Sequence, residues 1–247
     1  MHKLSVLTVL VVLIFVATSG FADVFQVTAE NAGVQVPNGL PYETFDTQTP
    51  GTALSGTFTT TYGGTSYQGD YTGNLVWRYP GAFGGAFGTV FPGANWTQSY
   101  DIAITPLNGN PAANYFGLWF SALDPGSQLQ FYDGSTLLFT FTPAAFISLV
   151  GGCPNAADAY CGNPNNGADS GEQFAYLNFY DTNGTFDKIV VTELSICGGC
   201  GFESDNHAVA NLPTGPGGLP IPTPEPGSLA LFASGILSIA AMRHTRR

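Results

Sequence analysis

YFGLWFSAL, from Tyr115 to Leu123, is apolar at almost every position. An amphipathic helix or a half-buried strand would interrupt such a run with polar residues at a regular spacing, whereas a strand buried on both faces would not. The run is short and rich in aromatic residues, which favours a strand over a helix. We therefore expect a central strand that is packed on both of its faces.

The segment that follows, QLQFYDGSTLLFTFT at residues 128–142, alternates between apolar and polar positions. Leu129 and Phe131 share one face of the first half, and the apolar residues of the second half share one face as well. Asp133-Gly134 between the two halves is typical of a two-residue hairpin turn. This segment therefore predicts two antiparallel strands, each with one buried face.

Similar segments, separated by turn-forming residues, recur along the rest of the chain. We expect strands at 24–30, 52–62, 75–79, 99–107, 173–180, 188–196 and 202–210. Only residues 144–150 suggest a helical turn, and no repeat of fixed length points to a propeller. The predicted fold class is all-β, a jelly-roll-like antiparallel β-sandwich, with a C-terminal hydrophobic helix beyond it.

The composition supports this fold class and excludes one class of partner. The chain has 247 residues, of which 44% are hydrophobic and 9% charged, and a net charge of -11 at pH 7. Its 32 glycines and 17 prolines suit many turns between short strands. Because no basic excess is available to neutralise phosphates, no nucleic acid is expected as a partner.

Residues 1–22 have the order of a secretory signal peptide. His2 and Lys3 precede an apolar run, and small residues occupy the positions before a cleavage site after Ala22. The run is shorter than the ~20 residues that a membrane-spanning helix needs, which favours a cleaved signal over an anchor. We therefore expect export, with Asp23 as the first residue of the mature chain.

The C-terminal end begins with a Pro/Gly-rich segment. Residues 212–223 show no apolar periodicity and predict a linker. The motif Pro224-Glu225-Pro226-Gly227 follows, and then an apolar stretch at 229–242 and a basic terminus with three arginines. This stretch is long enough to cross only a thin membrane, and the arginines would stay on the cytoplasmic side.

This order resembles the PEP-CTERM sorting signal of bacterial surface proteins, which joins a Pro-Glu-Pro triplet, a short hydrophobic helix and an arginine-rich end. The resemblance covers residues 224–247. The same tail is also labelled an ice-binding protein C-terminal domain, a label that describes the tail and not an ice-binding activity. The resemblance implies export machinery, a short transmembrane helix, and an exosortase, a membrane protease that processes near the triplet. Delivery to the cell surface or the extracellular matrix would follow.

The middle of the chain resembles a group of exosortase-dependent surface proteins that carry this tail. The matching stretches are 115–124, 129–134 and 201–207. The resemblance transfers no enzymatic activity and implies a surface β-sandwich, which we place at residues 23–211.

Four cysteines in an exported chain predict two disulfides. Cys153 and Cys161 lie in one polar loop, and Cys197 and Cys200 form a tighter pair, so local pairing needs the least rearrangement of the chain. A zinc site of four thiolates and a redox-active Cys197–Cys200 pair are the alternatives. An oxidising compartment disfavours zinc, and the redox pair lacks its βαβ context.

The exported part is strongly acidic, with sixteen carboxylates against Arg78 and Lys188. Glu43, Asp46 and Asp205 lie in segments that a jelly roll could bring side by side. Because calcium accepts several oxygen ligands in flexible geometry, these three residues could share a calcium ion. The alternative is that they are solvated surface carboxylates.

Aromatic residues are frequent between positions 62 and 96 and suggest a carbohydrate-binding face, because an exposed ring can stack on a sugar. Trp77 and Trp96 are the candidates, with an extracellular polysaccharide as the ligand. The alternative is that both rings lie in the core.

Few residues suggest catalysis. His207 is expected to share a strand face with Asp205, but no Gly-x-Ser-x-Gly turn supplies a nucleophile. Two carboxylates could instead serve a secreted glycoside hydrolase. We predict a non-catalytic, exosortase-processed surface or matrix protein. A carbohydrate-binding face is a further hypothesis, and the hydrolase is the alternative.

Overall fold

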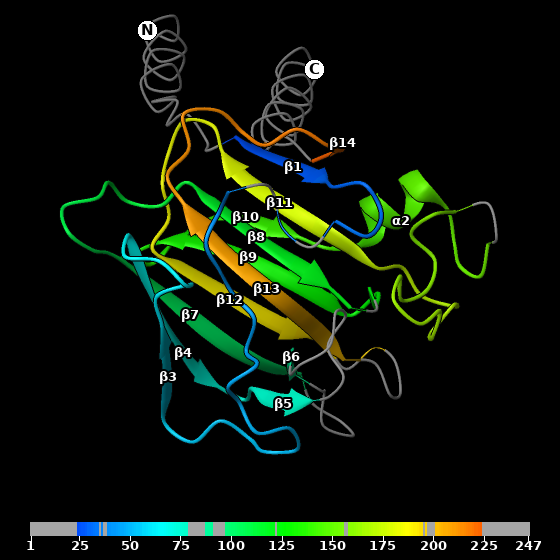
Figure 1. Ribbon diagram of the computed structural model, residues 1–247. Coiled ribbons are helices and arrows are strands. Elements are labelled where there is room, and N and C mark those ends of the chain that lie inside the picture. Colours follow the sequence, from blue (N-terminus) through cyan, green and yellow to red (C-terminus); the bar gives the residue numbers. More distant parts are fainter. Residues whose placement is uncertain are drawn as a thin grey trace, which may run out of the picture. The chain divides into compact units, whose positions relative to one another are not determined.

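The computed structural model describes residues 24–34, 36, 39–78, 87–90, 97–121, 123–155, 158–194, 196 and 201–223. Val24–Pro224 forms a compact unit. In its described part, two antiparallel sheets face each other and enclose the core (Figure 1). The prediction of an all-β sandwich is therefore confirmed, whereas the predicted signal peptide and C-terminal helix lie outside the described residues.

The first sheet has the strand order β14-β1-β11-β8-β13-β6-β5, and β2 also pairs with β13. Its strands are β1 (Phe25–Ala29), β2 (Tyr42–Glu43), β5 (Val76–Arg78), β6 (Phe87–Val90), β8 (Tyr115–Phe120), β11 (Ala175–Asp181), β13 (Phe202–Ala210) and β14 (Leu219–Ile221).

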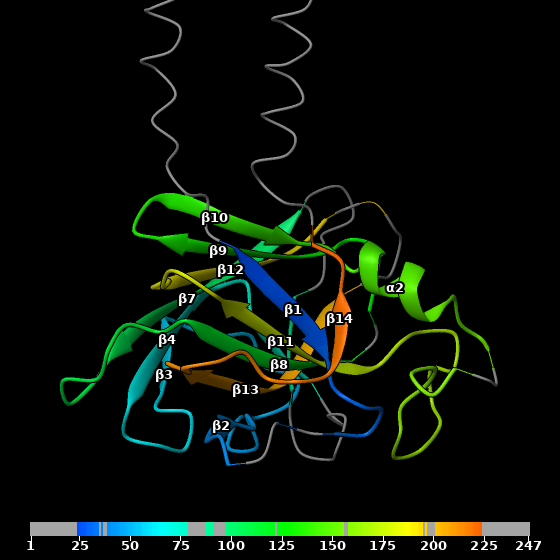
Figure 2. The same ribbon diagram turned by 90° about the horizontal axis from the view of Figure 1, so that it is seen from above.

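The second sheet has the order β10-β9-β12-β7-β4-β3. Its strands are β3 (Thr57–Thr60), β4 (Tyr67–Gly73), β7 (Gln98–Pro106), β9 (Ser127–Asp133), β10 (Thr136–Phe141) and β12 (Lys188–Glu193). Figure 2 shows the two layers, with β9, β12 and β7 in one and β1, β11, β8 and β13 in the other. The helix α2 (Ala144–Val150) follows β10, where the helical turn was expected.

The central strand β8 is buried along its whole length, as its apolar run predicts. Phe116, Leu118 and Phe120 belong to the main core between the sheets. Trp119 points the opposite way and packs with Tyr176 in a smaller cluster on the outer face of the first sheet. The strand therefore supports packing on both faces, with Trp119 on the outer one.

The β9–β10 hairpin has its turn one residue later than predicted. Asp133 and Thr136 pair with each other, so Gly134 and Ser135 form the two-residue loop. Gly134 has a φ of 56°, which fits glycine at the first central position of a type II′ turn. The turn therefore lies where Gly134 can supply the positive φ of the first central position, and Asp133 belongs to the strand before it.

The predicted linker is partly a strand. Within 212–223, β14 pairs with β1, and Val27 lies opposite Ile221. Ile221 is only 4% exposed and joins the main core. Thr28 Oγ1 also donates a hydrogen bond to Gly217 O at 3.0 Å. The interpretation of this segment as free of packed structure is therefore wrong, because one apolar side chain and two edge contacts hold it to the sheet.

Candidate functional site

A hydrogen-bonded network crosses the core between the two sheets. His207 on β13 lies 2.9 Å from Tyr71 Oη through Nδ1 and 2.9 Å from Ser204 Oγ through Nε2. Tyr100 Oη lies 3.3 Å from the same serine hydroxyl. None of these four side chains is more than 1% exposed. The network therefore connects β13 to β4 and β7 by hydrogen bonds, and its side chains are buried away from solvent.

The environment of His207 suits a structural role. Burial lowers its pKa to about 3, so the imidazole is neutral at physiological pH. The rings of Phe45 and Phe116 meet it edge to face, with centroids 5.0 and 5.3 Å away. A serine and a histidine at this distance could form a nucleophile and its base. Because both are enclosed by the core, a substrate has no route to Ser204.

His207 and Asp205 do not share a strand face, contrary to the prediction. The pairing of β13 with β8 shifts between Asp205 and Ala208, and Asn206 has a φ of 51°. Such a bulge places an extra residue in one strand and reverses the alternation beyond it. His207 therefore faces the core, whereas Asp205 pairs with Trp119 on the outer face.

Glu43, Asp46 and Asp205 are neighbours, since β2 pairs with β13. Burial, and to a smaller extent the charges of Asp46 and Glu43, raise the pKa of Asp205 to about 8. Glu43, however, already accepts hydrogen bonds from Phe45 N at 2.7 Å and from the Thr60 hydroxyl. Across the described residues, no three carboxylates offer oxygens within 4.8 Å of one another. Calcium at this trio stays a prediction.

Trp77 is a core residue, and the prediction that its ring stacks on a sugar is wrong. Its side chain is 2% exposed and packs against Phe45 and Phe58, with ring centroids 5.1 and 5.3 Å away. The alternation of β5 turns the ring toward the second sheet, where these aromatic residues gather. Trp96 lies outside the described residues.

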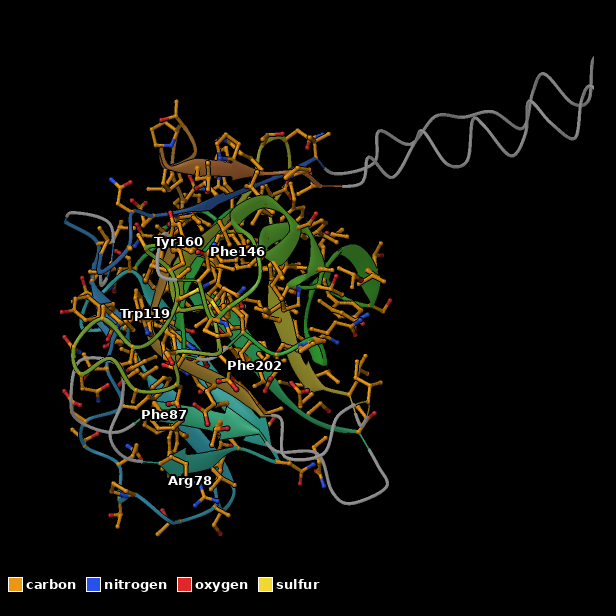
Figure 3. The ribbon with its side chains drawn as sticks, turned by 90° about the vertical axis from the view of Figure 1, so that its right-hand side faces the viewer. Arg78, Phe87, Trp119, Phe146, Tyr160 and Phe202 are labelled. Carbon is orange, nitrogen blue, oxygen red and sulfur yellow. A yellow bond between two sulfur atoms is a disulfide. The ribbon has the colours of Figure 1, made fainter. Side chains whose placement is uncertain are left out.

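The predicted Cys153–Cys161 disulfide is present, and Figure 3 shows it in yellow close to Tyr160 and Phe146. Asp158 lies beside the two sulfur atoms, within 4.8 Å. Because the sulfurs are bonded to each other, they offer no thiolate, and a zinc site at this pair is excluded. Cys197 and Cys200 lie outside the described residues.

Replacing Cys153 and Cys161 together with serine is expected to lower the free energy of unfolding by about 2–3 kcal/mol, because the bridge restricts the unfolded chain. It closes a loop over a sequence separation of 8. Urea denaturation followed by tryptophan fluorescence measures the change, with the reduced wild-type chain as the control. An unchanged midpoint would mean that other contacts hold this loop.

A second group of carboxylates lies at the end of the sandwich where β8 finishes. We call Asp124, Asp169, Glu172 and Glu203 the carboxylate end. Burial raises the pKa of Glu203 to about 8, with smaller contributions from the other three, while Arg78 lowers it. Burial is also the main cause of the raised pKa values of Asp124 and Glu172. These residues come from separate segments, so no spacing rule could join them from the sequence.

Glu193 lies in the core at the end of β12. Its side chain is 0% exposed, and its Oε2 accepts a hydrogen bond from Ser127 Oγ at 3.0 Å, whereas Oε1 has no partner in the described part of the chain. A Cβ on Gly126 would lie 2.0 Å from this oxygen, so a side chain there would displace the carboxylate. Burial raises the Glu193 pKa to about 7, with a smaller contribution from Asp124.

Glu193→Gln is expected to make the protein more stable than wild type at pH 8 and equally stable near pH 4.5. A carboxyl whose pKa is raised on folding stabilises below its unfolded pKa and loses this contribution as the pH rises through 7. Glutamine does not titrate and keeps the acceptor for Ser127. The gain at pH 8 is about 2 kcal/mol, below the full linkage value because the surrounding groups can relax around an ionised carboxylate. Urea denaturation from pH 4.5 to 8 in chelating buffer measures it, and parallel pH profiles would contradict it.

The end of the chain matches a known family of sorting motifs. Residues 222–247 match the family described as the PEP-CTERM protein-sorting motif. The chain carries a PEP-CTERM sorting signal. The resemblance seen at Pro224-Glu225-Pro226-Gly227 is thereby confirmed, and the PEP-CTERM motif implies exosortase processing, export and association with the cell envelope or surface. No curated protein matches the chain. Among the described residues, no helix is long and apolar enough to cross a membrane.

The PEP-CTERM match begins immediately after β14. Ile221 ends this strand inside the core, and Thr223 Oγ1 donates a hydrogen bond to Phe25 O at 3.1 Å. The sorting motif therefore starts on the folded domain rather than on a free linker, next to the strand that follows the predicted signal peptide.

Proposed function

We propose that the protein is an exported surface or extracellular-matrix protein that is held in the membrane until an exosortase processes it. The observation that carries this proposal is the PEP-CTERM motif at residues 222–247. In this scheme residues 1–22 start export as a signal peptide, and the apolar stretch at 229–242 anchors the chain. Processing near the Pro-Glu-Pro triplet would then release the β-sandwich to the polysaccharide matrix.

Intact-mass spectrometry of the protein recovered from the envelope and from the medium tests this proposal. The mature protein is expected to begin at Asp23 and to lack the apolar stretch that follows the triplet. A chain that keeps both ends in every fraction would overturn it.

We further propose that the β-sandwich is non-catalytic. The Ser204–His207 pair is enclosed by the core. Glu203 and Asp205, two residues apart on β13, are one carboxylate pair that a glycoside hydrolase could use. Such an enzyme needs one protonated and one ionised carboxyl group. Both pKa values are raised to about 8, so the two groups would be protonated together at neutral pH. Release of reducing sugar from extracellular polysaccharides, abolished in Glu203→Gln, would favour the hydrolase instead.

We also propose that the β-sandwich binds carbohydrate. The support for this binding is the destination of the protein, a matrix rich in polysaccharide. With Trp77 in the core, Trp96 is the residue on which sugar stacking depends. Titration of the full chain with extracellular polysaccharides tests it beside Trp96→Ala, with Tyr132→Ala on the second sheet as the matched control. Binding that is absent, or unchanged in Trp96→Ala, would count against stacking at this residue.

A further inference from the structure

Three neighbouring strands of the first sheet, β11, β8 and β13, meet at the carboxylate end, on the side of the domain that faces the viewer in Figure 3. Beyond the last residue of β8, Ser121 N donates a hydrogen bond to Glu203 O at 3.0 Å on one side. On the other side, Leu123 N donates one to Gln173 O at 2.9 Å. The chain after β8 therefore runs between the start of β13 and the segment before β11.

The residues of the carboxylate end come from the segment after β8, the segment before β11 and the start of β13. Asp124 lies in the turn after β8, where its Oδ2 accepts a hydrogen bond from Gly201 N at 2.8 Å, two residues before Glu203. Glu172 directly precedes Gln173, whose carbonyl oxygen accepts the hydrogen bond from Leu123 N. Arg78 is the one cation that acts on Glu203 here, against three other carboxylates. The carboxylate end therefore gathers more acidic groups than basic ones in a partly buried place.

Two buried hydroxyls flank Glu203 on the same face of the sheet. Thr89 on β6 is its direct partner on one side, and Ser121 lies beside it on the other. Thr89 is 0% and Ser121 5% exposed, and neither Oγ atom has a hydrogen-bond partner among the described residues. Because a buried hydroxyl loses its hydration, nearly all of them find partners. Two unpaired hydroxyls beside a carboxylate therefore point to a ligand that offers them a polar or ionic contact.

We propose that the carboxylate end binds a divalent cation with the preferences of calcium, through Glu203, Glu172 and Asp124, with the hydroxyls of Ser121 and Thr89 at the same site. All of these donors are oxygens, which suit calcium and not zinc or copper. No three carboxylate oxygens lie within 4.8 Å of one another in the described residues, so hydroxyls, backbone carbonyls and water complete the ligand set. Calcium tolerates such mixed, irregular sites, whereas magnesium demands a compact octahedron.

Thermal unfolding of the full chain in detergent tests the proposal, with chelator, calcium or magnesium at 10 mM. For an affinity typical of extracellular sites, calcium is expected to raise the melting temperature by about 3–10 °C over chelator, and magnesium by much less. Glu203→Gln and Glu172→Gln are expected to lose this calcium shift while melting in chelator at or above the wild-type temperature, because glutamine keeps the size of the side chain and replaces a group that burial makes costly to ionise. Asp101→Asn, on β7 of the second sheet, is the matched control and keeps the shift.

Terbium luminescence, excited through Trp119, which lies two residues before Ser121 on the outer face of the sheet, gives a readout that does not depend on stability. We expect a saturable terbium signal that calcium displaces and that weakens in Ser121→Ala. The proposal is overturned if calcium changes neither the melting temperature nor the terbium signal of wild type, or if Glu203→Gln keeps both responses. Equal effects of calcium and magnesium would likewise overturn a site with calcium's preferences.

Discussion

Replacing Pro224, Glu225 and Pro226 together with alanine is expected to leave the exported chain unprocessed, with the processed fraction reduced at least about tenfold. The two prolines restrict the backbone of the triplet, and the glutamate gives it its only charge. A protease that selects this motif loses both features in the variant. Immunoblots of envelope and medium fractions measure the change, as a larger band that stays with the membrane.

The matched control is Pro213→Ala with Pro216→Ala. These two prolines lie in the Pro/Gly-rich segment but outside the 222–247 match, so processing should continue. Glu225→Gln alone separates the charge of the triplet from its shape. If the triple variant is processed as wild type is, residues 224–226 do not determine recognition, and the sorting function must be assigned to another part of the tail.

The position of β14 adds a physical constraint to this experiment. The match begins one residue after Ile221, which is buried against the core. A protease acts on extended, accessible chain, and the segment just before the triplet is tied to β1. The alanine variant should therefore keep Pro220 and Pro222 unchanged, so that any loss of processing reflects the motif and not a loosened β14.

Strands whose two faces differ clearly in polarity could be predicted from the sequence. The alternation of apolar and polar residues predicts β9. The strand β8 lacks this difference between its faces, and its continuous apolar run predicts it instead. The same rule misses β4, because glycines and polar residues hide its alternation. Tyr67, Gly69 and Tyr71 are its buried positions, and Gly69 leaves room for the Tyr62 hydroxyl, which would lie 2.0 Å from a Cβ there. Several aromatic residues that suggested a sugar-binding face are therefore core residues.

The candidate site depends on features that a single sequence does not display. Which carboxylates meet at the end of the sandwich follows from the order β11-β8-β13, and that order is set by long-range pairing. The direction of His207 depends on the bulge at Asn206, a local change of alternation without a sequence signature. The disulfide and the sorting motif, in contrast, rest on short spacings and could be predicted.

His207→Ala is expected to produce the largest loss of stability, about 3–5 kcal/mol, which is a large part of the ~5–15 kcal/mol that stabilises a typical domain. Two effects add. The substitution opens a cavity beside Phe45 and Phe116, whose rings contact the imidazole. It also leaves the buried Tyr71 hydroxyl without its 2.9 Å partner. Urea denaturation at pH 7, where the imidazole is neutral, measures the loss.

Tyr71→Phe separates these two effects, because it removes one hydroxyl and keeps the ring. Its expected cost is about 1–3 kcal/mol, the penalty for leaving His207 Nδ1 unpaired in the core. The double variant His207→Ala/Tyr71→Phe leaves neither partner of this contact unpaired. Its loss of stability should therefore be smaller than the sum of the two single losses, by about 0.5–3 kcal/mol. Strict additivity would show that the contact between Tyr71 and His207 contributes nothing, and that His207 stabilises the sandwich through its packing and its contact with Ser204.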